Sequence, residues 1–181
     1  TPFLDSLSNR GRYFNNAYSA GIHTYNGVFS TLFSFPAIFT QHPMKTSPIS
    51  KYHGLATTLR NNNYSTIYFT THDGQFDNIE GFLKENDFEN VISKQDYPSD
   101  SSKTTLGVPD DYMFRFSMPL LADLYKQEKP FLAVYLTSSN HAPYYIPDYF
   151  VPHTKDISKG NVEYADFSLR KFIQISEKQP W

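Results

Sequence analysis

The sequence has 181 residues, enough for one domain with a hydrophobic core. Aromatic residues make up 17% and charged residues 19%, a balance that excludes a disordered chain. The net charge of −2 and the lack of Lys/Arg-rich runs argue against nucleic acid or an anionic membrane surface as a partner. The absence of cysteine excludes disulfides, thiolate metal sites and cysteine nucleophiles. With no signal peptide and no apolar run of membrane-spanning length, we expect these 181 residues to be soluble.

Helical and strand patterns alternate along the first half of the chain. Val28, Leu32 and Phe35 are spaced as one apolar face of a helix that begins at Thr24 and ends near Pro36. Ser50 has the character of an N-cap for a later helix. Helices are therefore expected over residues 2–9, 24–36 and 50–61, and strands over 12–19 and 65–71.

The second half of the chain continues this alternation. Pro109 is expected at the first helical position of a long helix, with Pro119 as a potential kink. The near-continuous apolar run 130–137 is typical of a central parallel strand. Helices are expected over 76–86, 109–124 and 162–175, strands over 87–92 and 130–137, and a loop over 94–105. This order predicts an α/β fold with a mostly parallel sheet flanked by helices.

Thr24 stands where the helix over residues 24–36 is expected to begin. A threonine at this position can cap the first helical turn. Its hydroxyl would also lie where backbone N–H groups and the helix dipole favour a bound anion. Both interpretations of Thr24, as a structural cap and as part of an anion site, remain open at this point.

Two polar loops follow predicted strands and contain histidines, His72 and His141. Ligands of open α/β sheets bind beyond the carboxyl ends of the strands. A lone histidine in such a loop is more often structural than catalytic. Asp73 and Asp77 equally suit turns and helix caps. The loops therefore point to a site only if they converge with the Thr24 turn.

A series of linked motifs runs through the chain in a fixed order: TPFLDSL at residues 1–7, the segment 14–19, the turn 21–29, the strand and loop 131–144, and the helix segment 164–166. In this order the motifs resemble the alkaline-phosphatase/sulfatase superfamily. Within it they are similar to the lipoteichoic acid synthase-like branch of phosphoglycerol and phosphoethanolamine transferases. The resemblance implies an alkaline-phosphatase-like fold. Both ends of the sequence fall within continuing patterns, so we expect residues 1–181 to be one partial, truncated catalytic domain of a longer protein.

The resemblance also assigns roles to individual residues. It implies that Thr24 is the nucleophile, forming a phospho-threonine intermediate, and that Thr24 is also a ligand of a divalent metal ion (Mn, Zn or Mg). His141 matches the substrate-loop histidine of the family, and His72 falls near a second substrate-binding histidine. Asn26 is included as a substrate-binding candidate only for its proximity to Thr24. The other metal ligands of the family would lie outside these residues, so we expect the chain alone to retain little metal and little activity.

The implied reaction moves a phosphoglycerol- or phosphoethanolamine-type headgroup from a phospholipid to an acceptor alcohol. The parent protein would be anchored in a bacterial cell membrane, with its catalytic domain outside the cytoplasm. The turn Thr24–Gly27 lacks the C/S-x-P-x-R pattern of true sulfatases, which argues against sulfate-ester hydrolysis. Phe76–Asn78 stands where lipoteichoic acid synthases have a tryptophan–asparagine–arginine group, so the headgroup stays open. A phosphodiesterase or sulfatase-like hydrolase, and a non-catalytic binding relative, remain the alternatives.

Overall fold

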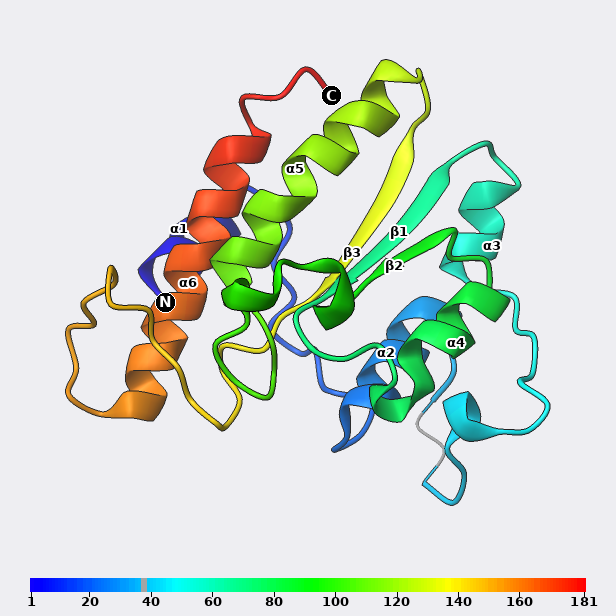
Figure 1. Cartoon of the computed structure of the whole chain (residues 1–181), viewed down its shortest axis with the longest axis horizontal. Helices are drawn as coiled ribbons and strands as arrows, with labels where there is room; N and C mark the ends of the chain where they lie inside the picture. The colour runs from blue at the N-terminus through cyan, green and yellow to red at the C-terminus, as the bar shows by residue number, and fades with distance from the viewer. Residues whose placement is uncertain (37–38) are drawn as a thin grey trace.

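The computed structural model describes residues 1–36 and 39–181, and in these residues a three-stranded sheet forms the centre of the fold (Figure 1). The strands are β1 (Ser65–Thr70), β2 (Asn90–Ile92) and β3 (Phe131–Leu136), in the order β2-β1-β3. Both pairings are parallel, and β1 and β3 are in register from Ser65 opposite Phe131 to Thr70 opposite Leu136. The predicted α/β class with a parallel sheet is confirmed.

The strand β1 is the central strand of the sheet. All six of its residues are buried, whereas all six residues of β3 are half-buried. Within the described part of the chain β3 pairs only with β1, so the prediction that the run 130–137 is a central strand is wrong. The error arises because β3 is as apolar as a central strand but its outer edge has no partner strand among these residues.

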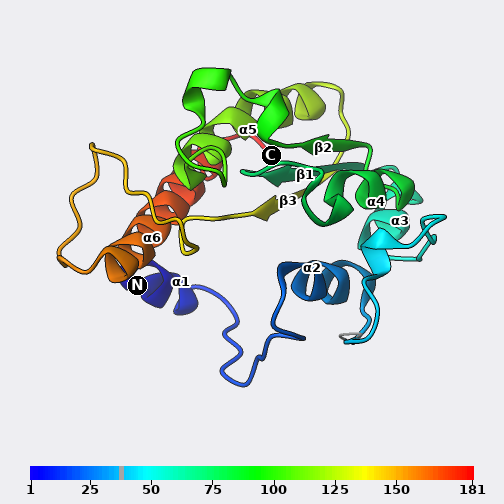
Figure 2. The same ribbon diagram turned by 60° about the horizontal axis from the view of Figure 1, so that its bottom comes forward.

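Helices cover both faces of the sheet (Figures 1 and 2). The helices are α1 (Pro2–Ser8), α2 (Thr24–Phe33), α3 (Leu55–Arg60), α4 (Ile79–Glu85), α5 (Asp110–Lys126) and α6 (Ile157–Ser176). Helices α2, α3 and α4 share one hydrophobic core with Tyr68 of β1, and α5 shares another with Ile67 and Phe69. Successive β1 side chains thus enter opposite cores, as the two-residue period of a strand requires. None of the helices in the described ranges is long and apolar enough to cross a membrane.

Aromatic contacts dominate both cores. On one face the rings of Phe33 and Phe82 lie 5.4 Å apart and join α2 to α4. On the other, the ring of Phe114 in α5 stacks on Phe172 of α6 at 4.5 Å, and Tyr135 of β3 contacts the same phenylalanine at 5.0 Å. The many aromatic residues of the sequence therefore fasten the helices to a small sheet.

Helix α1 is held by a side chain from the other end of the sequence. The buried carboxylate of Asp166 in α6 accepts hydrogen bonds from the backbone N–H groups of Phe3 (3.0 Å) and Leu4 (2.9 Å). These N–H groups belong to the first turn of α1 and have no partner within the helix. Asp166 therefore caps α1 from outside and fixes the N-terminal segment against α6.

The predicted strand over residues 12–19 is wrong. This segment is irregular and extends away from the sheet (Figure 2). Its aromatic side chains are exposed, with 73% of Tyr13, 72% of Phe14 and 88% of Tyr18 accessible. The prediction rests on a weak alternation, and no strand of residues 1–36 and 39–181 lies beside the segment to pair with its backbone.

The helix predicted over residues 50–61 begins later, at Leu55, with Gly54 as its N-cap in place of Ser50. The buried side chain of Asn86 explains the difference. Its Oδ1 accepts a hydrogen bond from the Tyr52 backbone N–H at 2.6 Å, and its Nδ2 donates to the Ser50 carbonyl at 3.2 Å. Because these backbone groups bond to Asn86, residues 50–52 stay outside the helix.

The helix predicted over residues 76–86 is also shorter, because Asp77 and Asn78 adopt positive φ angles of 53° and 56°. The Asp77 carboxylate pairs with Lys45 (2.7 Å) and lies 3.2 Å from His42. Asn78 Nδ2 donates to the Met44 carbonyl at 2.8 Å. These contacts hold a tight turn (Phe76–Asn78) ahead of α4.

Smaller differences concern the ends of elements. Helix α2 ends at Phe33 because Ser34 adopts φ 60°. The predicted core residue Phe35 is therefore 43% exposed, and Phe29 and Phe33 are buried instead.

Pro109 is the N-cap of α5 rather than its first residue, and the helix continues through Pro119. Helix α6 starts five residues early because Asp156 caps Ser158 and Lys159. Strand β2 is only three residues long, and the loop 94–105 contains the short turns Lys94–Asp96 and Ser99–Ser101.

Candidate active site

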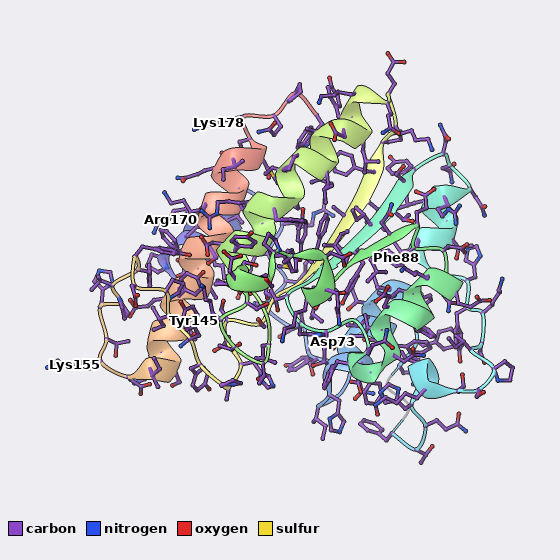
Figure 3. All side chains as sticks on the ribbon, viewed as in Figure 1. Asp73, Phe88, Tyr145, Lys155, Arg170 and Lys178 are labelled. Atoms are coloured by element: carbon purple, nitrogen blue, oxygen red, sulfur yellow. The ribbon has the colours of Figure 1, made fainter. Side chains whose placement is uncertain are left out.

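Thr24, His72 and His141 line one cavity of about 210 Å³ beyond the carboxyl ends of β1 and β3. The three loops therefore meet at one place, which is the condition for interpreting them as a site. The other lining residues come from the end of β3, from the loops after β1 and β3 and from the segment before α5: Asp73, Phe76, Thr105, Leu106, Leu136, Thr137 and Ser138. Figure 3 labels Asp73 and Tyr145, which lie in the loops after β1 and β3 at the same end of the sheet.

Thr24 is the first residue of α2, and the N-cap is His23. The interpretation of Thr24 as the capping residue is therefore wrong. Its side chain is exposed and faces the cavity, at the positive end of the α2 dipole. This placement gives a hydroxyl group that stands where an anion is stabilised.

Asn26 lies beneath the turn and does not line the cavity. It is 3% exposed, and its Oδ1 accepts a hydrogen bond from the His23 backbone N–H at 3.3 Å, one half of a capping box. A Cβ on Gly21 would lie 2.6 Å from the Asn26 side chain, so the chain passes very close to it. These contacts make Asn26 a support for the turn that carries Thr24 rather than a group that faces the cavity.

His72 follows β1 by two residues and is 8% exposed. Its Nδ1 lies 3.0 Å from the Asp73 carbonyl oxygen, which can only accept, so Nδ1 carries the proton. Burial lowers the pKa of His72 below its usual 6.5, although the hydrogen bond to Asp73 opposes the shift. The neutral ring then has a free lone pair at Nε2.

His141 is exposed but has the same local arrangement. Its Nδ1 donates to the carbonyl oxygen of the next residue, Ala142, at 2.5 Å. When neutral, this ring too has its free lone pair at Nε2. The cavity therefore combines one hydroxyl group at a helix N-terminus with two imidazoles of the same tautomer.

Asp110 supports the site, and its role was missed by sequence reasoning, which treated it only as an acidic residue in the first turn of a helix. It is 1% exposed, and its carboxylate accepts hydrogen bonds from the backbone N–H groups of Ser138 (2.8 Å) and Ser139 (3.2 Å). Burial raises the pKa of Asp110, while these hydrogen bonds oppose the shift. The sequence signal was the pair of aspartates after Pro109, which marks a helix start but not what the side chains bond to.

Thr105 and Leu106 form a wall of the cavity that the sequence indicated only as loop. Their position depends on Gly107, whose φ is +86° and whose added Cβ would overlap the Thr71 carbonyl oxygen. The Val108 N–H bonds to the same oxygen at 3.4 Å. Gly107 thus lets the segment before α5 pack directly on the end of β1.

A metal ion requires several ligands in one place. Within residues 1–36 and 39–181, no three His, Cys, Asp or Glu side chains are grouped so as to hold one. The Thr24 hydroxyl and two Nε2 atoms are too few oxygen and acidic donors for a Mg or Mn site, and not the four ligands of a zinc site. These residues alone therefore do not fit a divalent metal.

Comparison with known proteins places the chain in a family. The family model described as Sulfatase matches residues 1–178. The chain belongs to the sulfatase family. The predicted superfamily is thereby confirmed, with the family model covering nearly all of the chain.

Two solved structures resemble this sulfatase-family chain. The first is a protein in the alkaline phosphatase superfamily from Vibrio parahaemolyticus, with a TM-score of 0.91 and 25% identity over 100% of this chain. The second is the lipoteichoic acid synthase LtaP from Listeria monocytogenes, with a TM-score of 0.82 and 26% identity over 98% of this chain. These similarities support the predicted placement of the chain in the lipoteichoic acid synthase-like branch. The chain spans 45% and 46% of the two structures, less than half of either.

Proposed function

We propose that the protein containing this chain is a phosphotransferase that moves a phosphoglycerol- or phosphoethanolamine-type headgroup from a phospholipid to an acceptor alcohol. The observation that carries this proposal is the cavity that Thr24 shares with His72 and His141. Membership of the sulfatase family and similarity to LtaP support enzymatic chemistry on an ester of this general kind. The headgroup transfer itself is our inference from the resemblance to the lipoteichoic acid synthase-like branch.

The reaction would take place in two steps at Thr24. In the first, Thr24 Oγ1 forms a bond to the lipid phosphorus while the bond from phosphorus to the diacylglycerol oxygen breaks, and diacylglycerol leaves with the threonine proton. In the second, the acceptor hydroxyl attacks the phosphorus, the bond to Oγ1 breaks, and Thr24 regains a proton. The N-terminus of α2 would stabilise the phosphate oxygens throughout.

His72 and His141 would bind the headgroup. Because Nδ1 of each ring donates to a backbone carbonyl, each neutral imidazole can accept a hydrogen bond at Nε2. A glycerol hydroxyl and an ethanolamine ammonium are both donors and would suit these acceptors. Phe76, which contacts the His72 ring edge-on at 5.3 Å, would cover the apolar part of the headgroup.

For the divalent metal (Mn, Zn or Mg), we propose that Thr24 contributes one ligand and that the remaining ligands lie outside these 181 residues. When bound, such an ion would lower the pKa of the threonine hydroxyl. We further propose that the protein is anchored in a bacterial cell membrane with this region outside the cytoplasm. The chain alone is then expected to show little activity.

Hydrolysis is the second candidate function, because Thr24 and His141 are exposed and water could serve as the acceptor. Product analysis separates the two outcomes. Transfer yields a phosphorylated acceptor, whereas hydrolysis of the threonine adduct yields free glycerol phosphate or phosphoethanolamine.

The test uses the full-length protein with vesicles of phosphatidylglycerol or phosphatidylethanolamine and measures diacylglycerol release. Thr24→Ala should lower turnover at least about 1,000-fold, because it removes the attacking oxygen. Thr24→Ser should retain measurable turnover. Thr31→Ala, an exposed threonine in the same helix, is the matched control and should be unaffected. Normal turnover by Thr24→Ala would contradict the proposal.

A further inference from the structure

We propose that Asp110 is a positioning residue that holds His141 in the cavity by clamping the backbone of the β3 loop. The inference rests on the proposed function only in assigning His141 to the headgroup. The clamp itself is a feature of the loop, and it can be tested without any reaction.

The clamp is a single carboxylate that bonds to two consecutive backbone N–H groups. Asp110 Oδ1 accepts from Ser138 at 2.8 Å and Oδ2 accepts from Ser139 at 3.2 Å. Asp110 is 1% exposed and Ser139 is 9% exposed, so water does not replace these bonds readily. Charge-assisted hydrogen bonds of this type are stronger than neutral ones.

The clamped residues lead directly to His141. The His141 backbone N–H donates to the Ser138 carbonyl at 3.0 Å, which closes a turn over residues 138–141. Thr71, the residue directly after β1, donates from Oγ1 to Ser138 Oγ at 2.7 Å. The turn is therefore fixed to α5 by Asp110 and to β1 by Thr71.

His141 depends on this turn more than His72 depends on its own loop. The His141 side chain is exposed, and its ring bonds to Ala142 within the same loop. Core packing therefore does not set its position. Burying a carboxylate without partners costs free energy of folding, and burial raises the pKa of Asp110. Two backbone N–H groups converge on this side chain, and a carboxylate offers each of them its own acceptor oxygen.

Asp111 provides a matched control. It is also buried, with 6% exposure, and lies in the same helical turn. Its Oδ1 accepts from the hydroxyls of Tyr149 and Tyr164, and its Oδ2 pairs with Arg115 at 3.3 Å. Its side chain has no bond to the turn over residues 138–141 among these contacts. Asp111→Asn therefore changes a buried carboxylate without touching the clamp.

The first experiment measures amide hydrogen exchange in the full-length protein. In Asp110→Asn the new NH₂ group faces a backbone N–H, so one clamp bond is lost. We expect exchange at Ser138 and Ser139 to become at least about tenfold faster, by the loss of one charge-assisted bond, while Asp111→Asn leaves it unchanged. Unchanged exchange in Asp110→Asn would overturn the clamp, whatever the protein catalyses.

The second experiment is a double-mutant cycle on kcat/KM with His141→Ala. Asp110→Asn alone should lower kcat/KM about tenfold, but in the His141→Ala background it should lower it less than twofold, because the two residues act as one unit. Independent, fully additive losses would show that Asp110 does not act through His141. That result would contradict the clamp but not the proposed function. An active Thr24→Ala protein, in contrast, would contradict the proposed function but not the hydrogen-exchange evidence for the clamp.

If Asp110→Asn does not fold, Asp110→Glu replaces it in both experiments. It keeps both acceptor oxygens but moves them by one methylene group. We expect intermediate exchange rates at Ser138 and Ser139, and a smaller loss of kcat/KM that again disappears in the His141→Ala background. Wild-type exchange combined with an additive loss would overturn the proposal.

Discussion

The loops after β1 and β3 deliver chemically similar histidines by different physical means. Both rings donate from Nδ1 to the carbonyl of the following residue and leave Nε2 free when neutral. His72 is 8% exposed and packs against neighbouring loops, while His141 is exposed. His72 is therefore held by burial, and His141 by backbone bonds to its turn.

One site thus combines a buried half, which contains His72, and an exposed half, which contains His141. The buried half is part of the fold, so a change at His72 should affect both stability and activity. The exposed half is supported from α5, so a change at His141 should affect activity alone.

Replacing either histidine by alanine should lower kcat/KM by roughly 10- to 100-fold, the cost of losing a hydrogen bond to a charged or polar headgroup. His72→Ala should also lower the free energy of unfolding by about 1–3 kcal/mol, because it empties a buried site. His141→Ala should change that free energy by less than about 0.5 kcal/mol. Enzyme assays and urea denaturation of the two variants provide the comparison. Equal losses of stability would show that the two halves are not held differently.

Gly107→Ala should disturb the wall formed by Thr105 and Leu106. A Cβ would overlap the Thr71 carbonyl oxygen, and φ is +86°. We expect a loss of about 1–3 kcal/mol in the free energy of unfolding from this strained position. Gly27→Ala is the control: it lies inside α2 with nothing within 4 Å of its Cβ, so it should stabilise the protein by about 0.5–1 kcal/mol. If both variants changed the free energy of unfolding by the same amount, Gly107 would not be holding the wall in place.

The pH dependence of stability should report on the buried half of the site. Burial lowers the pKa of His72 below 6.5, so below that pH the unfolded chain binds more protons than the folded one. The free energy of unfolding should therefore fall as pH drops below about 6.5. His72→Gln should make this part of the curve flatter, while His53→Gln, which removes an exposed imidazole, should not. An unchanged curve for His72→Gln would argue against a buried neutral imidazole.

The parts of the fold that could be predicted from sequence are those in which local pattern and burial agree. The β-branched and aromatic run of β1 and the apolar face of α5 needed no distant information. The segment 12–19 alternates only weakly, and strand pairing depends on a neighbouring strand, which no local pattern reveals. Residues 50–52 stay outside the helix because Asn86, far along the chain, bonds to their backbone.

The candidate site was predictable to a similar extent. Motif resemblance selected Thr24, His72 and His141, and the structure brings these three to one cavity. Their catalytic and binding roles stay predictions. Asn26 was selected by proximity alone, which cannot distinguish a side chain that faces the cavity from one that supports the turn beneath it. Asp110 was not selected because its partners are backbone N–H groups 28 and 29 residues away.

Trapping the covalent intermediate on Thr24 tests the proposed role of Thr24 as the nucleophile most directly. Full-length protein is mixed with phosphatidylglycerol vesicles without acceptor, quenched in acid, digested and examined by mass spectrometry. We expect a phosphoglycerol adduct on the peptide that contains Thr24, absent from Thr24→Ala and from protein incubated with a lipid that lacks phosphate. Turnover of the lipid with no adduct on Thr24, or with an adduct on another residue, would contradict the account.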